Sequence, residues 1–166
     1  MDKRNLVNLY AAIAAITVFG FTLGLMFPLL SLIMEKRGIG ADWIGYNAAM
    51  QPLGIVLSVF AIPRLVRRFG SKASVIGAAL LAAAVVLAYP LLPVFWWWFG
   101  LRILHGFLTA MLFAISEAWI VRFAEGRYRS RILALYVSVL AASFGGGPAL
   151  ISVTGIEGML PFIIGA

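Results

Sequence analysis

The segment PRLVRRFGSK at 63–72, followed by SVIGAALLAAAVVLAYPLLP at 74–93, decides the fold. The second segment carries no charged side chain over its whole length, and a helix needs about 20 such residues to cross roughly 30 Å of hydrocarbon. The first segment holds four cations and no acidic residue. A cationic segment beside a long apolar run is typical of a membrane helix that starts at the cytoplasmic surface.

Four further apolar runs lie at 6–33, 43–62, 97–121 and 132–154, so we predict five membrane spans. Of the 13 lysines and arginines, ten fall on alternate connections, two fall on the other connections and one, Arg102, lies inside a run. Because cytoplasmic loops carry such an excess, the pattern predicts a cytoplasmic N-terminus. The ten are Lys3, Arg4, Arg64, Arg67, Arg68, Lys72, Arg122, Arg127, Arg129 and Arg131.

The composition agrees with an all-α, polytopic membrane protein that forms one domain over 1–166. Apolar residues make up 63% of the chain and charged residues 11%, against about 45–50% and 25% in soluble domains. The net charge of +7 sits in short loops, where it marks topology and meets anionic lipid rather than nucleic acid. The absence of cysteine excludes disulfides and cysteine-based metal sites.

The last segment, 158–166, starts another apolar run, and nine helical residues cover only about 14 Å. We expect the chain to be a fragment cut within a sixth span; the alternative is a short re-entrant piece.

The fourth run carries the most informative polar pattern. Arg102, Gly106, Ala110 and Ala114 recur every fourth residue, and Glu117 follows three residues later, which places them along one helical face. Small residues at this spacing let another helix approach closely. A charge inside a span usually lines a cavity or has a partner.

Each of these polar residues has two interpretations. Arg102 either faces a cavity or extends its side chain to the nearby interface. Glu117 is expected to form a structural or gating ion pair with Arg64, Arg67, Arg68 or Lys72, and a proton-carrying role is the alternative. His105 suits proton transfer or a structural hydrogen bond. No second histidine or carboxylate cluster accompanies it, so we predict no metal and no cofactor.

Two other runs contribute candidates. Asn47 and Gln51 are four residues apart and face one way; they bond a neighbouring helix or contact a solute. Gly20 and Gly24 form a G-x-x-x-G pattern that close packing explains. The segment 20–27 also resembles 106–113, three spans later, and such an echo is typical of an inverted repeat, although similar composition alone could produce it.

Three motifs resemble the major facilitator superfamily, and in particular its N-terminal six-helix half. Segment 102–106 (RILHG) is similar to the family's R-x-x-Q-G signature, with histidine in place of glutamine. Segment 63–72 resembles its G-x-L-A-D-R-x-G-R-K loop, with Arg67 in place of the aspartate. Gly147-Pro148 resembles its glycine-proline helix motif, and glycines 145–147 are expected to loosen that helix locally.

The resemblance implies twelve helices in two halves, a solute site between them and transport by alternating access. It marks Arg102 as affecting substrate or proton coupling, and Arg68, Gly70 and Lys72 as conformational-switch positions. In the family the aspartate of this loop closes the cytoplasmic side against the second half. Arg67 stands in its place, which puts this closure in doubt. Gly147 and Pro148 join Gly20, Gly24 and Gly106 as helix-packing positions.

We therefore predict a secondary transporter of a small solute, coupled to protons or another ion, in the bacterial inner membrane. Its partners would be lipid, the solute, and a missing C-terminal half or a second copy of the chain. The alternatives are a non-transporting membrane scaffold or binding protein, and a half-transporter that acts as a dimer. An enzyme is not expected, because no nucleophile–base pair or metal set has credible spacing.

Overall fold

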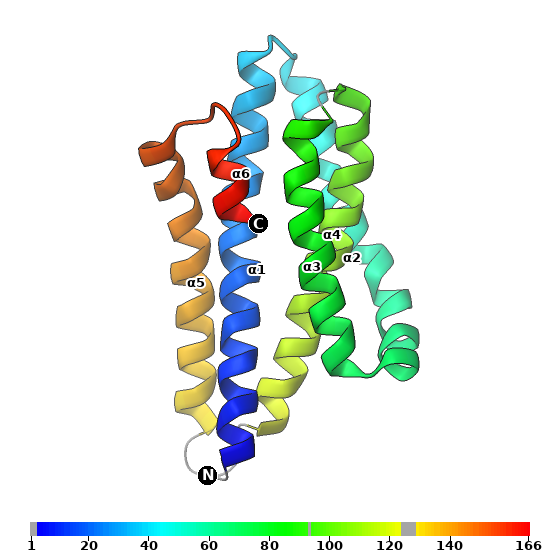
Figure 1. The fold of residues 1–166 in the computed structure, drawn as a ribbon, viewed down its shortest axis with the longest axis vertical. Helices are drawn as coiled ribbons and strands as arrows, with labels where there is room; N and C mark the ends of the chain where they lie inside the picture. Colours follow the sequence, from blue (N-terminus) through cyan, green and yellow to red (C-terminus); the bar gives the residue numbers. More distant parts are fainter. Residues whose placement is uncertain (1–2, 93, 124–128) are drawn as a thin grey trace.

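The computed structural model describes residues 3–92, 94–123 and 129–166, with side chains from residue 10 onward, except that of residue 123. The described chain consists of helices and short links (Figure 1). The helices are α1 (Lys3–Lys36), α2 (Ala41–Phe69), α3 (Ser71–Leu91), α4 (Phe95–Phe123), α5 (Arg129–Thr154) and α6 (Leu160–Gly165). The predicted all-α fold is confirmed.

Five of these helices are long and apolar enough to cross a membrane, namely all except α6. Their candidate spans are 21 to 29 residues long, above the roughly 20 residues that hydrocarbon requires. This confirms the prediction of an integral membrane protein with five complete spans.

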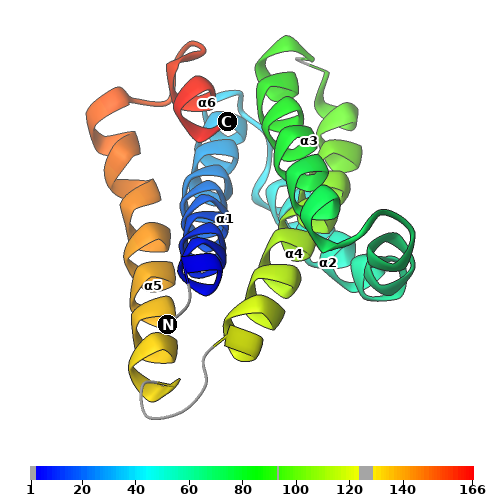
Figure 2. The same cartoon turned by 60° about the horizontal axis from the view of Figure 1, so that its bottom comes forward.

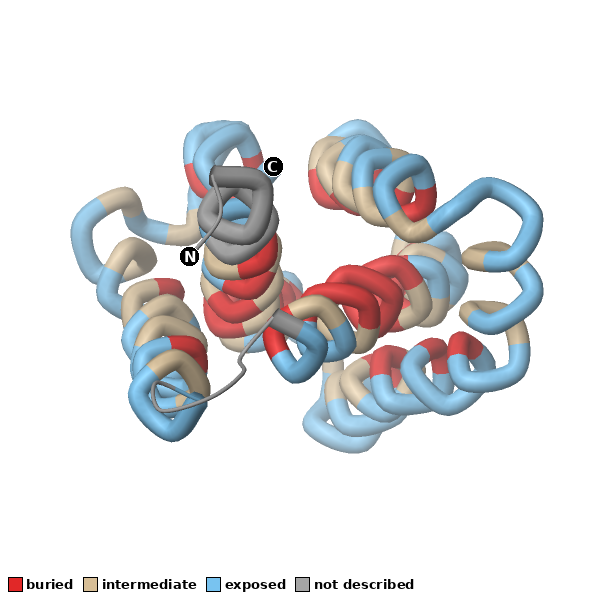
Figure 3. Tube along the Cα trace, turned by 90° about the horizontal axis from the view of Figure 1, so that it is seen from below, coloured by how far each residue is buried: buried red, intermediate tan, exposed pale blue. Residues whose placement is uncertain are grey.

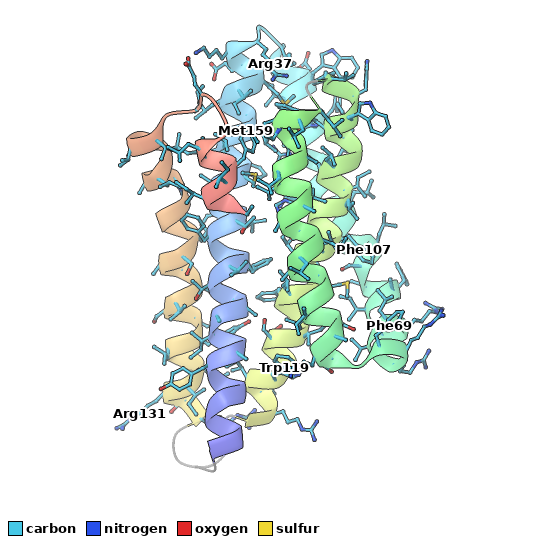
Figure 4. The ribbon with its side chains drawn as sticks, viewed as in Figure 1. Arg37, Phe69, Phe107, Trp119, Arg131 and Met159 are labelled. Carbon is cyan, nitrogen blue, oxygen red and sulfur yellow. The ribbon has the colours of Figure 1, made fainter. Side chains whose placement is uncertain are left out.

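The helices run alternately up and down, so the predicted cationic connections share one end of the molecule (Figure 1). Phe69, beside the α2–α3 link, and Arg131, at the start of α5, both lie at the lower end, whereas Arg37 lies at the upper end (Figure 4). The side chains of Lys3, Arg4 and Arg127 lie outside the described residues. The arrangement has the alternation that the charge pattern predicted.

Helix α2 is longer than its hydrophobic run indicated. We expected 63–73 to be a cytoplasmic link, but α2 continues through Pro63 to Phe69 and only Gly70 separates it from α3. Leu65 and Val66 pack against the core and so stabilise the added turns. Gly70 has φ of 80°, a left-handed conformation that glycine adopts without steric cost.

The expected loosening of α5 at glycines 145–147 is wrong, because the helix is continuous from Arg129 to Thr154. The backbone of Gly147 lies against Gly24 and Leu25 of α1, and this packing supports the helix where glycine alone would weaken it.

The long helices pack in two pairs, α1 along α5 and α2 along α4 (Figure 2). The main core lies between α1, α3 and α4. Helix α4 also packs against α1 and α3 and therefore joins the pairs. Burial is greatest on α4 and α1, at 56% and 44% of their apolar windows, and Figure 3 shows the buried residues gathered there. Helix α6 turns back from the upper end and buries Phe162 against this core.

Candidate functional site

Arg102 lies at the centre of the most polar part of the interior. Its Nε donates to Asn47 Oδ1 at 3.1 Å and its Nη1 donates to Gln51 Oε1 at 3.0 Å. All three side chains are at most 1% exposed. The cation of α4 is therefore held by two amides of α2, and we call these three residues the Arg102 cluster.

The sequence of α2 explains why both amides point at α4. The buried residues of this helix are Asn47, Gln51, Gly54 and Ser58, which recur at four-, three- and four-residue intervals and so form one helical face. The first two members of this face were candidates in the sequence, whereas Gly54 and Ser58 were not. A search for small and polar residues at these intervals would have found them.

Glycines bring the two helices close enough for these bonds. A Cβ at Gly54 would collide with the backbone of Ile103 and Phe107, and a Cβ at Gly106 would collide with the carbonyl group of Gln51. Only a residue without a side chain permits this approach. Gly106 thus lies at the α2·α4 crossing, one turn of helix from Arg102.

Several polar atoms around Arg102 have no hydrogen-bond partner in the described structure. They are Asn47 Nδ2, Gln51 Nε2, both ring nitrogens of His105 and the hydroxyl of Tyr89. No carboxylate pairs with Arg102 among the described residues, where the ion pair found is that of Lys36 with Glu157. Buried polar groups are normally bonded, so this cluster retains unused capacity for hydrogen bonding.

Phe27 supplies a further contact from α1. Its ring centroid lies 5.4 Å from Arg102 Cζ, a distance at which a ring face attracts a guanidinium. Arg102 therefore contacts side chains of both α1 and α2. Neither Phe27 nor Tyr89 was a candidate in the sequence, because aromatic residues are common in all the apolar runs.

The rest of the predicted α4 face extends toward the lower end. Ala110 is buried, Ala114 is half-buried and Glu117 is exposed. The predicted pairing of Glu117 with Arg64, Arg67, Arg68 or Lys72 is not formed in this conformation. Arg67, Arg68 and Lys72 are exposed, on either side of Gly70 at the lower end of the molecule.

The other predicted packing residues build a second crossing, between α1 and α5. A Cβ at Gly24 would collide with the backbone of Phe144, and Gly20 lies beside Leu140 and Ser143. Gly147 is buried against α1, while its neighbour Pro148 is exposed on α5. This crossing carries no arginine or amide.

The upper end is held by charges and aromatic rings. Lys36 bonds Glu157, and Arg37 Cζ lies 4.7 Å from the ring centroid of Trp98. The hydrogen bond and the charge of Lys36 lower the pKa of Glu157 below its ordinary value. Trp98 Nε1 donates to the carbonyl oxygen of Leu92 at 2.9 Å, so the α3–α4 connection is fixed here too.

No group of three or more histidine, cysteine, aspartate or glutamate residues gathers within the described ranges. The chemistry available at the Arg102 cluster is accordingly a buried positive charge with uncharged hydrogen-bonding groups around it.

Comparison with known proteins places this geometry in context. The family model described as Major Facilitator Superfamily matches residues 12–165. The uncharacterized MFS-type transporter YfkF of Bacillus subtilis (strain 168) is 24% identical over 157 residues. An uncharacterized MFS-type transporter of Enterobacter sp. (strain 638) is 27% identical over 139 residues. No solved structure matches the chain.

The two alignments cover 95% and 82% of this chain. They cover 40% of the Bacillus protein and 36% of the Enterobacter protein. The chain thus spans well under half of the length of these relatives.

Proposed function

The chain belongs to the major facilitator superfamily, and on this premise we propose that it moves a small solute across the bacterial inner membrane by alternating access. In this proposal the N-terminus is cytoplasmic, transport is coupled to protons or another ion, and the Arg102 cluster is the polar centre of the mechanism. The MFS-type relatives support the transporter role.

The observation that carries the proposal is the unused bonding capacity around Arg102. The side-chain oxygens of Asn47 and Gln51 accept hydrogen bonds from the guanidinium, whereas their amide nitrogens have no partner in the described structure. A solute oxygen reaching this place would meet amide N–H donors beside a positive charge. Such a solute would satisfy groups that otherwise remain unpaired, which is the source of specificity at polar sites.

His105 offers a route for coupling. It is fully buried one turn from Arg102, and neither of its ring nitrogens has a partner in the described structure. Two positive charges at this separation in a membrane interior repel each other. Protonation of His105 would therefore weaken the hydrogen bonds of Arg102 to Asn47 and Gln51, and deprotonation would restore them.

A transporter of this kind needs a second set of helices facing the first. Helices α5 and α2 bury only 11% and 17% of their apolar windows, the smallest shares among the five spans. We propose that these two helices pack against a C-terminal half or against a second copy of the chain. The solute would pass between the two sets.

The test is transport by the longest reading frame that contains this chain, purified into proteoliposomes loaded with a pH-sensitive dye. A panel of small organic anions, amines and sugars is added, and solute-dependent proton flux is measured. We expect Arg102→Gln to abolish the flux that the unaltered protein shows, while Arg129→Gln, which removes an exposed charge at the lower end, leaves it unchanged. Normal flux in Arg102→Gln at normal expression would reject the assigned role.

A membrane scaffold is the second candidate, because both amide partners of Arg102 come from its own bundle. On that hypothesis the cluster only joins helices. The unaltered protein would then show no flux with any member of the panel, and Arg102→Gln would change nothing except stability.

A further inference from the structure

A groove of about 310 Å³ runs along the meeting line of α2, α3 and α4, away from the Arg102 cluster. Its walls are apolar and include Leu65 and Phe69 of α2, Gly77 and Leu81 of α3, and Phe107 and Met111 of α4. Phe69 and Leu81 are each 57% exposed, so the groove opens to the surroundings. Figure 4 shows Phe69 and Phe107 on the same flank of the molecule, with Phe69 at its lower end.

The lower end of this groove is bordered by cations. Arg64, Arg67, Arg68 and Lys72 are all exposed, and no acidic residue occurs between Pro63 and Ala73. Arg68 Cζ lies 5.4 Å from the ring centroid of Phe69, which lines the groove. Lys72 immediately precedes Ala73, another lining residue. We call Arg68 and Lys72 the cationic rim.

The size and direction of the groove fit one acyl chain. From Ala73 to Leu81 the wall formed by α3 extends for about 12 Å at 1.5 Å per residue. One leaflet of hydrocarbon is about 15 Å deep. The groove therefore leads from the charged end of the bundle through most of one leaflet.

We infer that the groove and its cationic rim bind one anionic phospholipid, with an acyl chain along the groove and the phosphate at Arg68 and Lys72. Lysine and arginine at a membrane surface attract anionic headgroups, and apolar walls accept a hydrocarbon chain. The single polar side chain in the lining is that of Ser74, whose hydroxyl already donates to the carbonyl oxygen of Gly70. Nothing else in the lining competes with an apolar occupant.

The positive charge of the cationic rim also argues against a second copy of the chain binding in the groove. A symmetric dimer formed through this groove would bring two sets of these cations together, and like charges at such an interface oppose binding. The inference does not rest on the proposed function, since none of these residues belongs to the Arg102 cluster and its test measures lipid binding rather than transport.

Native mass spectrometry of the purified protein in a neutral detergent tests this inference. The probes are phosphatidylglycerol and phosphatidylcholine with identical acyl chains. We expect phosphatidylglycerol to bind about 30-fold more tightly, as two headgroup-contacting cations would produce. Glycerol 3-phosphate, which has the phosphate without the chains, should not displace it at equal concentration.

Two variants and their controls locate the site. Arg68→Gln/Lys72→Gln should lose the preference for phosphatidylglycerol, whereas Arg129→Gln/Arg131→Gln, which removes two charges at the same end on α5, should keep it. Gly77→Leu should weaken the binding of both lipids. A Cβ at Gly77 meets nothing within 4 Å, so the leucine side chain would extend into the groove and occupy the space of the acyl chain. Gly100→Leu, at an equally open glycine outside the groove lining, should not.

Three results with the two lipids would overturn the inference. They are equal binding of the two lipids, equal loss in the α5 control, and unchanged binding in Gly77→Leu. Displacement by glycerol 3-phosphate alone would show that the rim binds phosphate without using the groove, and would also reject it.

Discussion

The α2·α4 and α1·α5 crossings have the same backbone construction and different side chains. At the first crossing, Gly106 lies against the carbonyl of Gln51, and Gly54 lies against the backbone of Phe107. At the second, Gly24 lies against the carbonyl of Phe144, and Gly147 lies against the backbone nitrogen of Leu25. Gly24 thus corresponds to Gly106, and Gly147 corresponds to Gly54.

This correspondence revises the internal echo noted in the sequence. The echo aligned Gly20 with Gly106, but the contacts align Gly24 with Gly106, a shift of one helical turn. In the revised register Gly20 takes the place of Arg102, while Leu140 and Phe144 take the places of Asn47 and Gln51. Since α1 and α4 run in opposite directions (Figure 1), the relation is an inverted one.

Close helix packing and polar chemistry are therefore separable features of this bundle. The α1·α5 crossing has close backbone contacts without an arginine or an amide, so we expect that the α2·α4 crossing does not need its arginine to bring the helices together. On this hypothesis the arginine and its two amides are an addition to a packing arrangement that forms without them. The following predictions test this separation.

The largest effect is expected from side chains placed at the crossings themselves. Gly106→Leu and Gly24→Leu each force a side chain into the backbone of the facing helix, and overpacking of this kind costs about 3 kcal/mol or more. Thermal unfolding in detergent should show a large and similar loss of stability for both.

Gly45→Leu is the matched control, because a Cβ there meets nothing within 4 Å. A Gly24→Leu protein as stable as this control would show that the α1·α5 backbones are not in contact.

The second prediction separates function from fold. Arg102→Met loses two interhelical hydrogen bonds, worth about 0.6–2 kcal/mol each in membranes. It also removes a charge whose insertion costs about 2.5–3.5 kcal/mol. These terms nearly cancel, so we expect the unfolding temperature to change by only a few degrees while solute transport falls at least tenfold.

Size-exclusion chromatography and thermal unfolding measure the fold, and proteoliposome flux measures transport. Extensive unfolding of Arg102→Met would mean that the arginine is required for helix packing, and the separation would then be wrong.

A smaller effect is the coupling within the Arg102 cluster. In a double-mutant cycle of Arg102→Met with Gln51→Leu, we expect a coupling free energy of about 1 kcal/mol, because the two side chains share a hydrogen bond. Leu140→Ala combined with Arg102→Met serves as the control, since the first change lies at the other crossing. Coupling of equal size in the control would show that the effect passes through the whole bundle.

The smallest effect concerns the Lys36–Glu157 pair, which joins the upper ends of α1 and the α5–α6 link outside both crossings. Because Lys36 lowers the pKa of Glu157, the pair stabilises the fold above the ordinary carboxyl value of 4.5 and is lost as the pH falls through the lowered pKa. Both side chains are exposed, so the loss is small and decreases with salt.

Unfolding temperatures of the unaltered protein and Glu157→Gln, measured from pH 7 to pH 3, should converge at low pH. A constant difference over this range would contradict the assignment.

Much of the fold could be predicted from the sequence, because hydrocarbon requires long apolar helices and the cations mark alternate ends. Helix ends were less predictable: hydropathy ends with the apolar run, whereas α2 continues through Arg64, Arg67 and Arg68 because a helix can extend past the hydrocarbon.

Single-residue candidates were identified more readily than their contacts. Arg102, Asn47 and Gln51 each stood out as polar residues within spans. The bonds between them depend on the register of α2 against α4, which Gly54 and Gly106 set from positions far apart in the chain. One sequence gives no information on which faces of two distant helices meet.

The joint at Gly70 determines how the bundle can bend. A single residue with φ of 80° separates α2 from α3, which leaves no slack between their lower ends. Any displacement of the lower end of α2 must therefore carry the lower end of α3 with it. A β-branched residue at position 70 would be strained, because a φ of 80° is unfavourable for any residue with a branched side chain.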